Sequence, residues 1–231
     1  MRRPKRLPME NLAPYLCDPV ANASGSDLRI DWVQLFGNDH PIEIEVGSGK
    51  GAFLIAAAEA NPGTNYLGIE IDRALQLYVA TRLAKRGLRN ARVAGTDARR
   101  LFHERIPAAS VRAVHVYFPD PWWKKRHHKR RVFTPEFAAV VARILRPGGR
   151  LHIVTDVEAY FGVMTGIVGA MAEFRPLPPP TPSEPRHDLD YLTNFERKFR
   201  KEGRLIYRAA YERTEVLSPE RIRELGPGGA S

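Results

Sequence analysis

The sequence contains a single cysteine, Cys17, among its 231 residues. One thiol excludes an intramolecular disulfide and any Cys-x-x-Cys pair that would hold zinc. No apolar run approaches the roughly 18 residues needed to span a bilayer. The basic start, MRRPKRLPMENL, lacks the following apolar segment of a signal peptide. These absences predict a cytoplasmic protein that has no membrane partner.

Acidic residues are also scarce relative to basic ones. The chain has 26 Asp and Glu against 36 Lys and Arg, a formal net charge of +10 and a pI of about 10.0. Such an excess bears on partners rather than on fold, and it favours nucleic acid over an anionic membrane or an acidic protein. With 43% hydrophobic residues, the chain is long and apolar enough for one large α/β domain.

Short β-rich segments alternate with longer helical ones, an order typical of a parallel sheet that has helices on both faces. We predict strands at residues 41–46, 65–70, 91–94, 111–118, 150–155 and 205–212. We predict helices at residues 31–36, 52–60, 72–86, 134–147 and 158–171. Asp72 and Thr134 are suited to cap two of these helices, and Gly87 to end one.

A glycine loop, Glu45-Val-Gly-Ser-Gly-Lys-Gly51, follows the first strand. In a doubly wound sheet the ligand lies at the carboxyl ends of the strands, beside this loop. The spacing is G-x-G-x-G, which matches neither the G-x-G-x-x-G of nicotinamide dehydrogenases nor the phosphate-binding loop of nucleotide hydrolases. An acid before the loop, Glu45, does not suit a pyrophosphate but would pair with the amino group of a cationic ligand.

Two further acids follow the next two strands. Glu70 is placed to accept both hydroxyls of a ribose, and Asp97, in Gly95-Thr-Asp-Ala98, lies where adenine edges are usually held. With Glu45, Gly47 and Gly49 they resemble the S-adenosylmethionine site of class I methyltransferases. The alternative is a tight turn with acids that only cap helices.

The segment YFPDPWWKKRHHKRR spans Tyr117–Arg131. Asp120 follows the fourth strand between two prolines, which fix the backbone on both sides. Six Lys and Arg residues come next without an acid, and such a run binds phosphates with release of counterions. A solvated charged surface is the alternative. His127 and His128 are adjacent, so their side chains point apart, and we predict no metal site.

Several motifs together resemble the bacterial tRNA (guanine-N7-)-methyltransferase family. FPDPW with KKRHHKRR is joined, in the family's order, by EIEVGSGKG, YLGIEID, TDA, TDVEAY and TNFERKFRKEG, from Pro41 to Glu212. The resemblance implies an α/β fold with a doubly wound, mostly parallel, seven-stranded class I methyltransferase sheet whose last strand is antiparallel. It implies methyl transfer from S-adenosylmethionine to N7 of the guanine at position 46 of tRNA, in the variable loop.

The resemblance also assigns roles by motif. Cofactor-binding residues are Glu45, Gly47, Gly49, Glu70, Asp97 and Asp120, of which Asp120 is also catalytic. Substrate-binding residues are Lys124, Asp156, Thr193, Asn194, Phe195 and Glu196. RNA-binding residues are Arg126, His127, His128, Lys129, Arg130 and Arg131. The implied organisation is a basic, partly ordered arm at 1–40, a methyltransferase domain at 41–217 and a flexible tail at 218–231, in a monomer or homodimer.

The implied reaction needs no general base, because guanine N7 carries a free lone pair at neutral pH. In-line attack needs alignment above all. We expect Asp156 or Glu196 to accept hydrogen bonds from guanine N1–H and the 2-amino group, and Asp120 to orient the reacting pair. Two alternatives remain open: a non-catalytic RNA-binding protein on a methyltransferase fold, and a methyltransferase for a different RNA or a small molecule.

Overall fold

The computed structural model describes residues 7–19, 23–24, 29–122, 125–178, 196 and 202–215. Its helices are α1 (Met9–Leu12), α2 (Trp32–Phe36), α3 (Ala52–Ala60), α4 (Arg73–Arg86), α5 (Ala98–Glu104), α6 (Pro135–Ile144) and α7 (Glu158–Gly169), with 3-10 turns η1 (Ala13–Tyr15) and η2 (Lys125–Arg130). Its strands are β1 (Leu16–Cys17), β2 (Ala23–Ser24), β3 (Arg29–Ile30), β4 (Ile42–Val46), β5 (Asn65–Ile69), β6 (Ala91–Ala94), β7 (Val111–Tyr117), β8 (Leu145–Thr155), β9 (Phe174–Leu177) and β10 (Tyr207–Arg213).

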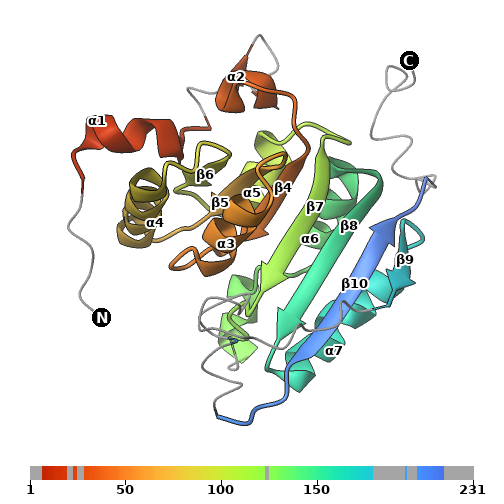
Figure 1. Ribbon diagram of the computed structural model, residues 1–231. Helices are drawn as coiled ribbons and strands as arrows, with labels where there is room; N and C mark the ends of the chain where they lie inside the picture. The colour runs from red at the N-terminus through yellow and green to blue at the C-terminus, as the bar shows by residue number, and fades with distance from the viewer. Residues whose placement is uncertain are drawn as a thin grey trace.

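One large sheet organises the molecule, with strand order β1-β6-β5-β4-β7-β8-β10-β9 (Figure 1). The pairs from β1 to β8 are parallel, and β10 runs antiparallel to both β8 and β9. The predicted doubly wound, mostly parallel sheet with an antiparallel last strand is therefore confirmed. Because β4 lies between β5 and β7, its carboxyl end is the point where the strand order reverses, and ligands bind at such points.

The sheet has eight strands where the resemblance implied seven. The additional strand is β1, whose Leu16 and Cys17 pair with Val93 and Ala94 of β6. A two-residue strand carries too little periodicity to be recognised in a sequence. It nevertheless covers the β6 edge, which would otherwise offer unpaired backbone groups.

Helices cover both faces of the sheet and enclose two apolar cores. One core joins α2, α5, α6 and α7 to the central strands, and it includes the stacked rings of Phe102 and Phe137. The other joins α1, η1, α3 and α4 to β5 and β6, and it contains the fully buried Leu12. The start of the chain, predicted as a partly ordered arm, thus contributes packed side chains to both cores, including those of Tyr15, Cys17 and Ile30. Residues 216–231, which contain the predicted tail, lie outside the described residues.

The helix ends follow the predicted capping residues. The Asp72 carboxylate accepts the N–H of Ala74 at 2.7 Å, and Gly87 ends α4 at a φ of 66°. The Thr134 hydroxyl accepts the N–H of Phe137 at 3.2 Å. These caps satisfy amide groups that a helix leaves unpaired, and they fix where α4 and α6 begin relative to the strands before them.

The sequence prediction missed α5 and β9. The seven residues of α5 include three charged side chains, and the four residues of β9 include a proline, so neither shows a clear period. Within the described residues, no helix is both long and apolar enough to cross a bilayer.

Candidate functional site

The glycine loop joins β4 to α3 at the carboxyl edge of the sheet. Gly47, Gly49 and Gly51 adopt φ angles of 75°, 53° and 68°, a region that side chains with a Cβ rarely occupy. The N–H groups of Gly47 and Ser48 both donate to the Ile69 carbonyl at 2.9 Å. The loop is therefore bent back over the end of β5.

Glu45 is buried beneath this loop, with 3% of its surface exposed. The N–H of Leu54, in the first turn of α3, donates to its carboxylate. Its other oxygen, Oε2, is buried and has no hydrogen-bond partner among the described residues. Burial raises the pKa of Glu45 well above its ordinary value, and the charge of Glu70 raises it further. A cationic group at Oε2 would satisfy this atom and stabilise the ionised form.

Glu70 follows β5 and faces the same loop. Its Oε2 accepts the N–H of Gly49 at 2.8 Å and its Oε1 accepts the N–H of Asp72 at 2.9 Å. The carboxylate is thereby held between the glycine loop and the start of α4. The next residue, Ile71, exposes 73% of its surface. Sequence reasoning missed Ile71; an apolar residue directly after the strand-ending acid was the available signal.

Asp97 follows β6 and caps α5, since its Oδ1 accepts the N–H of Arg99 at 2.8 Å. Its Oδ2 pairs with the Arg99 guanidinium, also at 2.8 Å. The hydrogen bonds from Arg99 lower the pKa of Asp97. The structure therefore places Asp97 at the predicted edge, already engaged by the cap and by one arginine.

Asp120 lies in a strained turn after β7, the strand that pairs with β4. Phe118 and Trp122, on either side of it, adopt φ angles of 49° and 44°. Such left-handed non-glycine residues cost on the order of 1–3 kcal/mol each and cluster at functional sites. The Phe118 N–H donates to the Val154 carbonyl at 2.7 Å, and the Pro121 carbonyl accepts Arg131 Nε at 2.7 Å. These bonds hold the exposed Asp120 in place.

The basic segment continues from this turn as η2. Arg126 and Arg130 are exposed, and the Arg130 guanidinium lies 5.0 Å from the centre of the Trp122 ring. The His127 ring meets the same indole at 5.7 Å, edge to face. Arg131 differs, because it binds the Pro121 carbonyl and lies over the Tyr160 ring at 4.9 Å. Arg131 therefore stabilises the turn that contains Asp120.

Both carboxylates expected to read guanine are engaged by arginines. Asp156, after β8, forms an ion pair with Arg204. Glu196 is 2% exposed and pairs with Arg208 of β10 at 2.5 Å. Lys124 and residues 193–195, the other predicted substrate contacts (Thr193, Asn194 and Phe195), lie outside the described residues. For His128 and Lys129 only the backbone is described.

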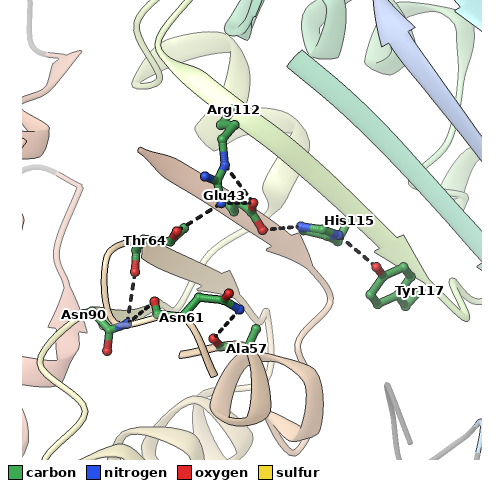
Figure 2. A network of polar contacts seen from close by, with 8 residues as sticks. All are labelled: Glu43, Ala57, Asn61, Thr64, Asn90, Arg112, His115 and Tyr117. Atoms are coloured by element: carbon green, nitrogen blue, oxygen red, sulfur yellow. Dashed lines mark hydrogen bonds and ion pairs between the residues drawn. The ribbon is translucent and has the colours of Figure 1, made fainter. Parts of the chain in front are cut away.

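A buried polar chain under the site was also missed. It joins Arg112, Glu43, His115 and Tyr117 through side-chain hydrogen bonds (Figure 2). The sequence signal for it was the charged Glu43 within a buried strand, together with His115 and Tyr117, which alternate onto one face of β7. His115 is buried, and both of its ring nitrogens have hydrogen-bond partners. No cluster of three candidate metal ligands occurs in the described part of the chain.

Comparisons with known proteins point to methyltransferases. The model of the family Methyltransf_4, described as "Putative methyltransferase", matches residues 39–209. A tRNA (guanine-N(7)-)-methyltransferase of Rhodopirellula baltica is 48% identical over 185 residues, 78% of this chain and 68% of the relative. A protein of the same name from Geobacter metallireducens is 39% identical over 213 residues, 89% of this chain and 96% of the relative.

Solved structures show the same fold at low identity. The 16S rRNA methyltransferase KamB aligns with a TM-score of 0.55 at 16% identity, covering 78% of this chain and 91% of that chain. The aminoglycoside resistance methyltransferase NpmB1 aligns with a TM-score of 0.53 at 18% identity, covering 79% and 92%. The sheet described above is therefore a methyltransferase fold.

Proposed function

Since the chain belongs to the family of tRNA (guanine-N(7)-)-methyltransferases, we propose that it transfers a methyl group from S-adenosylmethionine to N7 of a guanine in tRNA. The proposed target is the variable-loop guanine at position 46 of the tRNA. One observation carries the proposal: Glu45 near the end of β4, Glu70 after β5 and Asp120 after β7 lie at the carboxyl edge of three adjacent strands, and the exposed Arg126 and Arg130 follow in the segment after Asp120. That arrangement suits a cationic nucleoside donor beside a polyanionic acceptor.

The donor fits the residues present at its amino-acid end. Glu45 Oε2 is a buried carboxylate oxygen without a partner in the described chain, and an ammonium group would supply one. The glycine loop brings backbone close to the donor without side chains, since a Cβ at Gly47 or Gly49 would meet no atom within 4 Å. The loop is therefore open to a ligand above it.

The nucleoside end fits as well. Glu70 is placed to accept ribose hydroxyls, the role that an acid after the second strand has in this class of sheet. Ile71 offers an exposed apolar side chain to the flat adenine ring, and burying that side chain would stabilise the complex. Asp97, at the end of β6, lies at the adenine edge and would have to share its carboxylate with Arg99.

The acceptor end combines charge with base recognition. Arg126 and Arg130 attract phosphates, and Trp122 offers an indole already stacked with a guanidinium. Asp156 and Glu196 each pair with one arginine, and a carboxylate has lone pairs beyond those that one arginine uses. Either can accept from guanine N1–H and the 2-amino group. Adenine lacks these donors and would leave the carboxylate unmatched.

S-adenosylmethionine supplies a methyl group on an electrophilic sulfonium. The chain needs no general base, because guanine N7 presents its lone pair unprotonated. Glu45 and Glu70 fix the donor, Asp156 or Glu196 fixes the purine, and Asp120 holds the two in line. Alignment of this kind contributes on the order of 7–11 kcal/mol to lowering a barrier.

The direct test is incubation of the purified chain with labelled S-adenosylmethionine and bulk tRNA, followed by nucleoside analysis. We expect label in 7-methylguanosine and in no other nucleoside. Label in a different nucleoside would overturn the proposed site of transfer. A chain that binds tRNA but shows no heat of binding with S-adenosylmethionine would instead be a non-catalytic RNA-binding protein.

Glu45→Gln should separate donor binding from stability. Because the folded pKa of Glu45 is raised, ionised Glu45 destabilises the fold, and stability declines as pH rises from the ordinary carboxyl range toward the raised pKa. The variant should melt a few degrees higher at neutral pH, since about 1 kcal/mol shifts Tm by roughly 2–4 °C at this size. Its affinity for the donor should fall about tenfold or more, because the ammonium loses its charged partner.

Calorimetry at pH 6 and pH 8 checks this result. Donor affinity of the wild type should strengthen with pH, whereas that of Glu45→Gln should not. The matched control is Glu59→Gln, an exposed acid at the far end of α3, which should change neither property. Equal donor affinity of wild type and Glu45→Gln would contradict the role of Glu45.

A further inference from the structure

A continuous chain of hydrogen-bonded side chains leads from Arg112, near the amino-terminal end of β7, to Tyr117 at its carboxyl end. Arg112 donates to Glu43 Oε1 at 2.6 Å and to Thr64 Oγ1 at 3.0 Å. Glu43 Oε2 lies 2.9 Å from His115 Nε2, and His115 Nδ1 lies 2.8 Å from the Tyr117 hydroxyl (Figure 2). The Glu43 carboxylate and both ring nitrogens of His115 are paired, and a satisfied buried network is rigid.

The charge on Glu43 fixes the direction of the hydrogen bonds that its carboxylate forms with Arg112 and His115. Burial alone would raise the pKa of Glu43, but hydrogen bonds and charge from His115 and Arg112 outweigh it and lower the pKa to about 2. An ionised carboxylate only accepts, so His115 Nε2 carries a proton. His115 Nδ1 and the Tyr117 hydroxyl share the next hydrogen bond, at 2.8 Å, and the ¹⁵N spectrum described below reads out its direction. The hydroxyl is therefore held in place by His115.

Tyr117 is the last residue of β7 and lies between the two ends of the site. On one side of β7, His115 is paired with Glu45 of β4. On the other side, Tyr117 is paired with Val154 of β8, and Val154 is paired in turn with Arg208 of β10. Arg208 in turn binds Glu196. Burial raises the pKa of Tyr117 well above its ordinary value, and the charges of Glu45, Glu43 and Glu196 raise it further. Its ring thus has the donor acid on one side and a purine-reading acid on the other.

We propose that Tyr117 is a positioning residue for methyl transfer, and that His115 acts through it by fixing its hydroxyl. The proposal rests on the function proposed above. In this proposal the Tyr117 ring separates the donor at Glu45 from the purine at Glu196, and the Phe53 ring supports it in a T-shaped contact with the ring centres 5.0 Å apart. Displacement of the Tyr117 ring would misalign the reacting atoms without removing any contact that binds either molecule.

The first test is Tyr117→Phe, which removes the hydroxyl and keeps the ring. We expect kcat to fall about tenfold, since small misplacements reduce rate steeply. The KM for tRNA and the Kd for S-adenosylmethionine should stay within about twofold, and the melting temperature should change little. A role in stability alone would lower Tm and leave kcat unchanged.

The second test is coupling between the two residues. His115→Gln keeps an N–H toward Glu43 but offers no acceptor to Tyr117, so it should lose as much kcat as Tyr117→Phe. The double variant should lose no more than either single one, because both remove the same hydrogen bond. His115→Asn keeps an acceptor at the Nδ1 position and should recover part of the loss.

The control variant is His152→Gln. The His152 ring stacks on His115 at 5.0 Å but has no place in the hydrogen-bonded chain, so kcat should be retained. A readout independent of activity is the ¹⁵N spectrum of labelled histidine. It should show His115 protonated at Nε2, with the Nδ1 signal shifted in Tyr117→Phe.

Two results would overturn the proposal: a Tyr117→Phe enzyme within twofold of wild-type kcat, or kcat losses that multiply in the double variant. Either requires an active wild type, so it leaves the proposed function intact. A wild type that forms no 7-methylguanosine would instead remove the proposed function, and the ¹⁵N spectrum would still show whether Tyr117 donates to His115.

Discussion

Asp120→Ala should lower kcat for tRNA methylation by about 100-fold or more, while affinity for S-adenosylmethionine changes only severalfold. As methyl transfer proceeds, positive charge moves from the sulfur to the imidazole ring of guanine. A carboxylate beside the purine stabilises that developing charge. The strained backbone at Phe118 and Trp122 fixes the orientation of Asp120. Alanine at this position keeps the backbone but loses the carboxylate that would interact with the reacting groups.

Asp120→Asn distinguishes geometry from charge. Its amide oxygen still accepts a hydrogen bond, so the variant should retain about tenfold more activity than Asp120→Ala if orientation contributes. The control is Glu136→Ala, an exposed acid in the first turn of α6, which should leave kcat unchanged. Single-turnover methylation and calorimetry with S-adenosylmethionine are the measurements. Full turnover by Asp120→Ala would end the assignment of Asp120.

Replacing Arg126, Lys129 and Arg130 by alanine should weaken tRNA binding about 30- to 100-fold at low salt. The log–log slope of affinity against salt should fall by about 2–3, because each lost phosphate contact removes about 0.7–0.9 from it. Donor affinity should be unchanged. Arg131 is left in place, because it holds the Pro121 carbonyl and its loss would disturb the Asp120 turn.

The matched control removes the same charge elsewhere. Lys85, Arg146 and Arg150 are exposed and lie at the end of α4 or near the start of β8, away from the carboxyl ends of the strands. Their replacement by alanine should reduce affinity only slightly through net charge. If both triple variants lose affinity equally, attraction by overall charge would explain binding, and the segment after Asp120 would have no special role.

Much of the fold could be predicted because its signals are local. β5 is an apolar run, α4 has a capping aspartate and a terminal glycine, and each is readable within about 15 residues. Glu45, Glu70 and Asp120 could also be placed, since each lies within three residues of the carboxyl end of a strand. Elements without local signal were missed, notably β1, with two residues, and α5, with little apolar periodicity.

The contacts that complete the site could not be predicted from sequence. The bond between Glu43 and His115 spans 72 residues, and it forms only because β4 and β7 are neighbours in the sheet. The arginine partners of Asp156 and Glu196 likewise depend on where β10 enters, antiparallel to β8. Sequence motifs identify the candidate binding carboxylates, whereas tertiary packing determines which side chains each carboxylate already pairs with.

The two residues of β1 have a practical consequence for handling the protein. Leu16 and Cys17 are hydrogen-bonded along β6, and β6 ends three residues before Asp97. A truncation past residue 15 would therefore disturb the edge strand beside β6, the strand that precedes Asp97. The N-terminal residues Leu16 and Cys17 belong to the sheet itself, and changes there should be treated as changes to the fold.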